Sequence, residues 1–150
     1  MTPVELLEAI LEAYFGGETI VYGLLTANTT DWDTVRTNVF VADIAADRST
    51  NHPEIEMSEP DFSISGDAVN ERAELDSVDP EWTALPLGDV GDGKIQAVYV
   101  ALRVTDDDDS PIIKVIDVRS LSESARTPDG TDWAARIGSE GVLHLLPGDA

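Results

Sequence analysis

The chain has 150 residues, of which 42% are hydrophobic, and this content excludes a disordered acidic tail and suits one domain with a sizeable core. Thirty acidic residues against nine basic ones give a net charge of −21, and the absence of cysteine excludes disulfide and thiolate chemistry. No apolar run approaches the roughly 18 residues that a membrane span needs, and no basic cluster would hold a phosphate backbone, so we expect no membrane and no nucleic acid as partners.

The acidity has a distinctive composition. The carboxylates comprise eighteen Asp and twelve Glu, whereas Lys94 and Lys114 are the only lysines. Such a surface repels itself at low salt, but in molar salt the screening length falls to about 3 Å and the repulsion largely disappears. The composition therefore resembles that of haloarchaeal proteins, and we expect assembly in a high-salt cytoplasm. A DNA mimic would also be acidic, but it needs carboxylates on one face at phosphate-like spacing.

The N-terminal segment is predicted to be a helix over Thr2–Phe15. Thr2 and Glu5 form a capping box, Pro3 suits the first helical position, and Gly16-Gly17 ends the helix. An apolar stripe, which must pack on another surface, is formed by Val4, Leu7, Leu11 and Tyr14. We favour packing on one side of the same β domain over docking on a neighbouring subunit.

Two predicted strands and a loop follow the helix. Thr19–Thr26 carries apolar side chains on both faces, and a second alternation runs from Val35 to about Ile44. Ala45–Pro60 is polar, irregular and long for an internal loop, which predicts a functional surface loop or a contact arm.

The middle of the chain is predicted to form a sheet edge. Phe62-Ser63-Ile64 is predicted to be a short strand, followed by a turn at Ser65-Gly66-Asp67. Ala68–Ser77 is very polar for a strand, so we expect an exposed edge strand whose charges discourage strand addition. Trp82 and Leu85 are expected to close one end of the core.

The longest β-rich stretch, Gly93–Val118, is predicted to be an antiparallel hairpin at the centre of the fold. Ile95–Val104 is apolar on both faces, which indicates a strand that is covered on both sides, and Ile112–Val118 is the second strand. The loop between them must be at the surface because it holds four adjacent like charges, Asp106, Asp107, Asp108 and Asp109. These four are weak candidates for binding Ca²⁺ or Mg²⁺. A solvated hairpin tip is favoured, because the alternating ligands, glycine and distal glutamate of a calcium-binding loop are missing.

The C-terminal part offers two more short strands. Thr131–Ile137 alternates, although a helical turn from Asp132 competes, and Val142–Leu146 is the closing strand. Roughly eight short strands with frequent turns predict a mainly β fold, an antiparallel β-sandwich or jelly roll. We expect one domain over residues 1–150, with the helix in 1–17 and the sandwich in 18–150.

No motif indicates catalysis. His52 and His144 belong to no His-Glu-x-x-His sequence, and the chain has no Gly-x-Ser-x-Gly elbow and no glycine-rich phosphate loop. We therefore expect no enzymatic activity, no catalytic residue and no cofactor beyond a weakly bound cation. The enzymatic alternative is a carbohydrate-active β-sandwich in which Trp32, Trp82 and Trp133 stack on sugars, but packing in the core or in turns is favoured for them.

Several short segments occur along the chain in an order that resembles the order found in a known group of proteins. They are Asp79-Pro80, Trp82-Thr83-Ala84-Leu85, Gly88-Asp89-Val90, Ala97-Val98-Tyr99, Ser110-Pro111-Ile112-Ile113, Ile116-Asp117, a Trp-containing segment and Gly141-Val142-Leu143-His144-Leu145. This order, together with the N-terminal helix and the Thr-Ile-Val-Tyr-Gly-Leu-Leu run after it, resembles virion structural proteins of tailed viruses, including haloarchaeal ones. The chain departs from them in Ala45–Pro60 and at Gly91-Asp92-Gly93.

The resemblance implies a non-enzymatic β domain of a virion, assembled in the host cytoplasm. It implies a homo-oligomer that contacts the major capsid protein or tail and connector proteins. Decoration of the capsid or its vertices is the expected position, and a tail or head–tail connector component is the nearest alternative. An acidic DNA mimic that interacts with host proteins is the alternative from another class.

Overall fold

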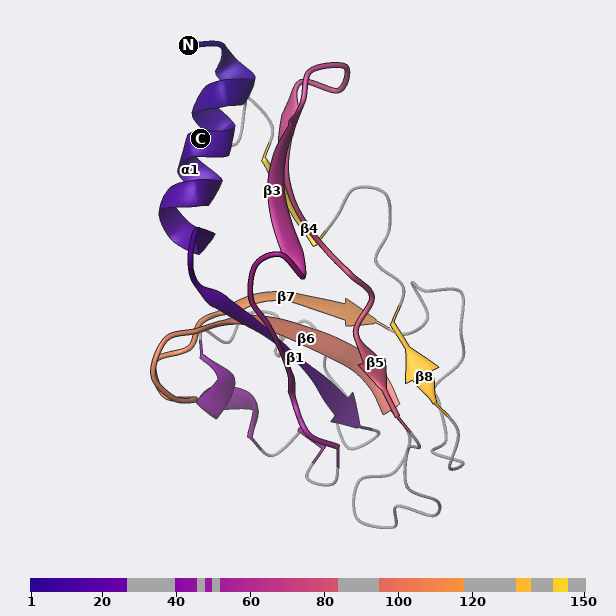
Figure 1. Cartoon of the computed structure of the whole chain (residues 1–150). Coiled ribbons are helices and arrows are strands. Elements are labelled where there is room, and N and C mark those ends of the chain that lie inside the picture. The colour runs from indigo at the N-terminus through magenta and orange to yellow at the C-terminus, as the bar shows by residue number, and fades with distance from the viewer. Residues whose placement is uncertain are drawn as a thin grey trace. The chain divides into compact units, whose positions relative to one another are not determined.

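The structure is a computed structural model that describes residues 1–26, 40–45, 48–49, 52–83, 95–117, 132–135 and 142–145. It is mainly β, with antiparallel sheets and one N-terminal helix, as the sequence predicted (Figure 1). Two compact units are found, one comprising Met1–Thr19, Met57–Asp79 and Ile137–Ala150 and the other Ile20–Glu56 and Pro80–Arg136. The single domain over residues 1–150 stays a prediction. No described helix is long and apolar enough to cross a bilayer.

The first unit contains a three-stranded sheet in the order β3-β4-β9, formed by β3 (Phe62–Asp67), β4 (Arg72–Ser77) and β9 (Leu143–Leu145). The strand predicted within Ala68–Ser77 is present as β4, but its predicted position at a sheet edge is wrong, and so is the predicted turn at Ser65-Gly66-Asp67. β4 lies in the middle of the sheet, and the turn comes after Asp67. Polar residues are tolerated there because Ala73 and Leu75 face the core, while Arg72 and Glu74 pair with each other at 2.6 Å.

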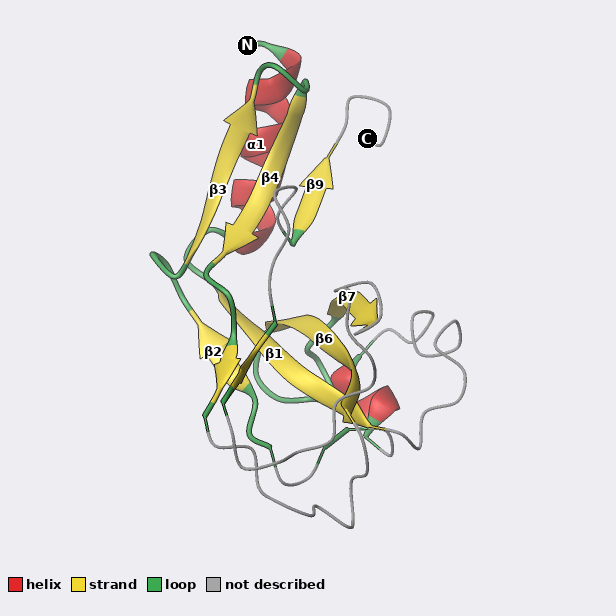
Figure 2. Cartoon of the chain, turned by 90° about the vertical axis from the view of Figure 1, so that its right-hand side faces the viewer, coloured by secondary structure: helices red, strands yellow, loops and turns green. Residues whose placement is uncertain are grey.

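Helix α1 (Pro3–Phe15) belongs to the same unit and contacts β3 and β4, as Figure 2 shows. Thr2 Oγ1 accepts the N–H of Glu5 at 3.2 Å, and the Glu5 carboxylate accepts the N–H of Thr2 at 2.6 Å, so the predicted capping box is present. Tyr14, predicted on the buried stripe, is 67% exposed. The helix thus covers a sheet of its own unit through its buried side chains, which are Leu7, Leu11 and Phe15.

The second unit contains a four-stranded sheet in the order β2-β1-β6-β7. Its strands are β1 (Thr19–Thr26), β2 (Ile55–Met57), β6 (Ile95–Arg103) and β7 (Ile112–Asp117). β6 and β7 pair antiparallel, which confirms the predicted hairpin, although only β6 is an inner strand of the sheet and β7 lies at its edge. Consecutive residues Ala97 to Ala101 are all buried, so β6 is covered on both faces, as its two apolar faces indicated.

Two short strands, β5 (Glu81–Trp82) and β8 (Trp133–Ala134), pair elsewhere in the second unit. The rings of Trp82 and Trp133 stack with centroids 5.7 Å apart, and both side chains are buried. The indole N–H of Trp82 donates to the Pro53 carbonyl at 3.0 Å. These two tryptophans therefore serve packing, whereas Trp32 lies outside the described residues.

The strand predicted from Val35 to Ile44 is wrong where the structure describes it. Phe40 forms only an isolated bridge to Pro111, and Val41–Ile44 is a 3₁₀ helix, η1. The Asp43 carboxylate accepts the Phe40 N–H at 3.0 Å, and this local bond favours a helical turn over an extended chain. Within Ala45–Pro60, which was predicted to be irregular, the sequence also missed β2.

Candidate functional site

Four charged side chains in the second unit form a closed ring of alternating charge, which we call the arginine–carboxylate ring: Arg48, Glu54, Arg103 and Asp107. Arg48 contacts Glu54 at 2.6 Å and Asp107 at 2.5 Å. Arg103 contacts Asp107 at 2.8 Å and also pairs with the other oxygen of Glu54. Two cations and two anions leave the ring with no net charge.

The ring connects the segment from η1 to β2 with the β6–β7 hairpin, which is about 50 to 60 positions away in sequence. Arg48 follows η1, Glu54 precedes β2, Arg103 ends β6, and Asp107 lies in the loop to β7. Three of the four side chains are at most 22% exposed, so their attraction is screened less by salt than that of a surface pair. The ring can therefore hold η1, β2 and the central hairpin together in molar salt.

Tyr99 extends the ring into the core. Its hydroxyl donates to Glu54 Oε1, and the Arg48 guanidinium lies 5.7 Å from the centre of its ring. Burial, then the hydrogen bond to Glu54 and the charge of Glu54, raise the pKa of the Tyr99 phenol. The phenol therefore stays a neutral hydrogen-bond donor.

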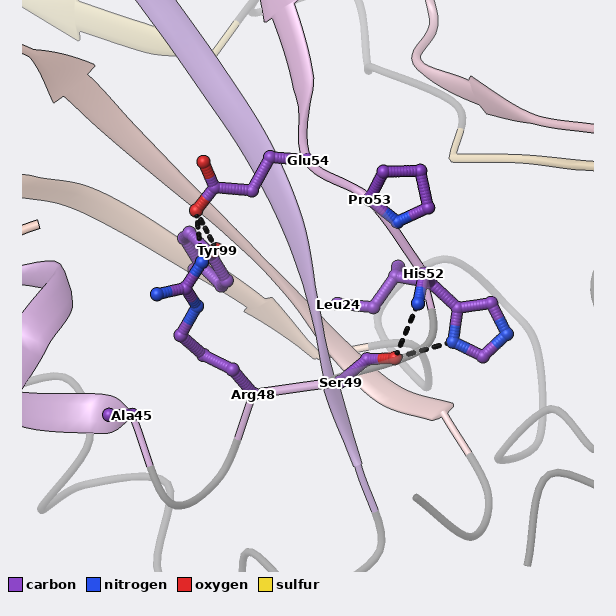
Figure 3. Close-up of a pocket in the computed structure, with 8 residues that line it drawn as sticks. All are labelled: Leu24, Ala45, Arg48, Ser49, His52, Pro53, Glu54 and Tyr99. Carbon is purple, nitrogen blue, oxygen red and sulfur yellow. Dashed lines mark hydrogen bonds and ion pairs between the residues drawn. The ribbon is translucent and has the colours of Figure 1, made fainter. Parts of the chain in front are cut away.

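A pocket of about 360 Å³ lies beside the arginine–carboxylate ring (Figure 3). Figure 3 shows Glu54, Arg48 and Tyr99 turned toward one another, with Ser49 and His52 joined beside them. Leu24, Ala45 and Pro53 complete the lining. Because the charged groups of the lining already neutralise each other, the pocket presents no excess charge to a ligand.

His52, which belongs to no catalytic or metal-binding motif in the sequence, lies in this pocket and is 5% exposed. The oxygen Ser49 Oγ is 2.5 Å from His52 Nδ1 and also accepts the backbone N–H of His52 at 3.2 Å. Such bonds within four residues are typical of a serine-capped turn, which gives this serine a structural role. His144 lies on β9 of the first unit, opposite Glu74 in the register.

The four aspartates predicted as cation candidates have separate roles in the loop. Asp107 belongs to the ring, where two guanidinium groups occupy its oxygens. Asp109 Oδ1 accepts the N–H groups of Thr105 and Asp106, both at 2.9 Å, and Asp106 accepts the N–H of Asp108 at 2.9 Å. Among the described residues, no three or more Asp, Glu or His side chains converge on one point. Weak binding of Ca²⁺ or Mg²⁺ by Asp106–Asp109 stays a prediction.

The sequence pattern singled out Asp107 but not its partners. Arg48 and Glu54 are 6 positions apart and Arg103 and Asp107 are 4 apart, but these two local pairs are joined by contacts across 59 and 49 positions, which no local motif reveals. The available signal was the scarcity of basic residues, since each arginine in so acidic a chain is a candidate for a specific pair.

Comparison with protein families, with curated proteins and with solved structures gives no match to this chain. The residues and their geometry are therefore the basis on which a function can be proposed.

Acidification is expected to remove the contribution of Asp107 to stability. Burial alone would raise the pKa of Asp107, but the hydrogen bonds and charges of Arg103 and Arg48 outweigh it and lower the pKa below the ordinary 3.8. A carboxyl with a lowered folded-state pKa stabilises the protein above its unfolded pKa, and this contribution is lost as the pH falls through the folded pKa. Wild type should therefore exceed Asp107→Asn in free energy of unfolding at neutral pH, and the difference should shrink below pH 3.8.

Chemical denaturation in molar KCl over a pH series would measure this difference. Asp108→Asn is the matched control, because Asp108 is exposed in the same loop, and it should change the free energy of unfolding by less than about 0.5 kcal/mol. A difference between wild type and Asp107→Asn that does not vary with pH would show that the charge of Asp107 is not used in the fold.

Proposed function

We propose that this chain is a non-enzymatic virion structural protein of a halophilic tailed virus. In this proposal it decorates the capsid or its vertices as a homo-oligomer in contact with the major capsid protein. The supports are the order of segments from Asp79 to Leu145 and the acidic composition with a net charge of −21. A tail or head–tail connector position is the nearest alternative.

The observation that supports the non-enzymatic part of the proposal is how the polar groups that line the pocket beside Tyr99 are used. Arg48, Glu54 and Tyr99 bind one another there, and Ser49 caps a turn at His52. A catalytic site needs a group that can accept or donate a proton to a substrate. Here the groups are positioned to stabilise the loop and hairpin, which favours a scaffold.

Two exposed apolar side chains on α1 support assembly with further copies or partners. Leu6 is 51% exposed and Tyr14 is 67% exposed on a helix whose other face packs on β3 and β4. Apolar side chains of this size gain stability when an interface covers them. A β-sandwich or jelly roll over residues 18–150 is part of the same proposal, and the antiparallel pairing within the sheets supports it.

The test is to purify particles, in molar salt, of the virus or provirus whose genome encodes this chain. Quantitative mass spectrometry would give its copy number relative to the major capsid protein. A comparable copy number is expected for a decoration protein, whereas a few copies per particle would indicate the tail or connector. Absence from the particles would overturn the proposal, and salt-sensitive capture by basic DNA-binding proteins would then favour a DNA mimic.

A further inference from the structure

A groove in the first unit runs between the N-terminal half of α1 and the tip of the β3–β4 hairpin. Figure 2 shows the helix and the hairpin side by side, and the groove between them has a volume of about 580 Å³. The residues that line it are Thr2, Pro3, Val4, Glu5, Glu8, Gly66, Ala68 and Glu71. We call this feature the α1 groove.

The helix approaches the hairpin closely at Gly66, where the side chains of Val4 and Glu8 lie against the glycine. Val4 Cγ1 would be 2.7 Å from a Cβ atom placed on Gly66, so only glycine at this position lets the helix approach the hairpin so closely. Pro3, Val4 and Ala68 give the lining an apolar surface. The groove is therefore able to cover a hydrocarbon chain.

The charge of the α1 groove has one sign. Its lining includes three glutamates and no basic residue. Glu5 is used by the capping box, whereas Glu8 and Glu71 have no basic partner in the described part of the chain. Arg72 follows Glu71 in the chain, but it pairs with Glu74 at 2.6 Å and lies 3.7 Å from Asp67.

We propose that the α1 groove binds a short basic, amphipathic segment of a partner protein. Arginine and lysine have long apolar stems and a cationic head, so a stem would lie against Val4 and Ala68 while its head pairs with Glu8 or Glu71. The inference rests on the proposed function in one respect, because in a virion the partner would be the protein to which this chain attaches.

A second copy of this chain does not supply such a segment. Its nine basic residues are scattered among thirty acidic ones. Three of the described basic residues, Arg48, Arg72 and Arg103, are already held by carboxylates of their own unit. Two copies would also bring two strongly negative surfaces together, which opposes their association.

High salt does not remove this mode of binding. At molar salt the screening length is about 3 Å, so long-range steering disappears while direct contact pairs keep part of their attraction. The burial of apolar stems depends little on charge and supplies the rest. Salt should thus slow association more than it weakens the bound complex.

The test uses a designed eight-residue peptide of alternating arginine and leucine, and a matched peptide in which glutamine replaces every arginine. Calorimetry or fluorescence anisotropy in molar KCl would give the dissociation constants for the full-length chain. The arginine peptide is expected to bind wild type, and the double variant Glu8→Gln/Glu71→Gln should weaken binding about tenfold, since each exposed pair contributes up to about 1 kcal/mol.

The matched control is Glu12→Gln/Glu18→Gln, which changes the net charge by the same amount at exposed positions outside the groove lining. It should leave the dissociation constant within about twofold of wild type. Equal weakening by both double variants would show that the peptide responds to overall charge, and it would overturn the proposal that the groove is the binding site. The absence of binding to wild type would also overturn it. Peptide binding and particle incorporation are separate measurements, so failure of one proposal is distinguishable from failure of the other.

Discussion

Replacing Glu54 with glutamine is expected to lower the free energy of unfolding by about 2 kcal/mol. Glu54 is the carboxylate of the arginine–carboxylate ring that accepts from three side chains, namely Arg48, Arg103 and the Tyr99 hydroxyl. Glutamine keeps the shape of the side chain but removes its negative charge, and its amide N–H group would face the N–H and O–H donors of these partners. Breaking a buried ion pair costs about 3–5 kcal/mol, and the 18% exposure of Glu54 reduces that figure.

The midpoint of thermal unfolding in molar KCl should therefore fall by about 4–8 °C, at about 2–4 °C for each kcal/mol in a chain of this size. Glu56→Gln is the matched control, because Glu56 is exposed on neighbouring β2 and has the same charge. It should shift the midpoint by less than about 2 °C. If both variants shift the midpoint equally, the ring contributes only through net charge.

The features that could be predicted from sequence are those set by local interactions. Helix α1 and the β6–β7 hairpin were predicted because their signals are local. The capping box of Thr2 and Glu5 sets the start of the helix, and the apolar run from Ile95 sets the long strand. Local hydrogen bonds and periodic burial need no information from distant parts of the chain.

Features that depend on distant partners were missed. Val41 and Ala42 have strand-like sequence around them, yet their N–H groups donate to the Ser110 and Asp107 carbonyls, each at 3.0 Å. Because these two N–H groups are bonded to the loop between β6 and β7, they are not available to a neighbouring strand, and the segment forms η1 instead. The arginine–carboxylate ring was missed for the same reason, because its members converge only after the central hairpin and the segment before β2 have met.

Polar composition misled the prediction for β4. Charged residues in Ala68–Ser77 indicated an exposed edge, whereas Arg72 and Glu74 satisfy each other and leave Ala73 and Leu75 to fill the core. The charges of β4 did not mark an edge because Arg72 and Glu74, two residues apart on the same face, pair with each other.

Replacing Gly23 with alanine is expected to destabilise the chain by about 3 kcal/mol, the upper end for overpacking. Gly23 lies in β1 beneath the Tyr99 ring, and an added Cβ would be 2.1 Å from Cζ and 2.2 Å from the hydroxyl oxygen. Without a steric clash, alanine in a strand would raise the free energy of unfolding by roughly 0.5–1 kcal/mol relative to glycine. A net decrease in the free energy of unfolding would therefore indicate the clash with Tyr99. Because Tyr99 also binds Glu54, its displacement would loosen the arginine–carboxylate ring.

A double-mutant cycle with Tyr99→Leu tests this contact, since leucine lacks the ring atoms that collide. Denaturant unfolding should show that Gly23→Ala costs about 2 kcal/mol less in the Tyr99→Leu background than in wild type. Gly17→Ala is the comparison, because Gly17 has a φ of +74° and no atom within 4 Å of an added Cβ. Its cost of about 1 kcal/mol comes from the backbone and should be equal in both backgrounds. Equal costs of Gly23→Ala in the two backgrounds would show that Tyr99 does not set the requirement for glycine in β1.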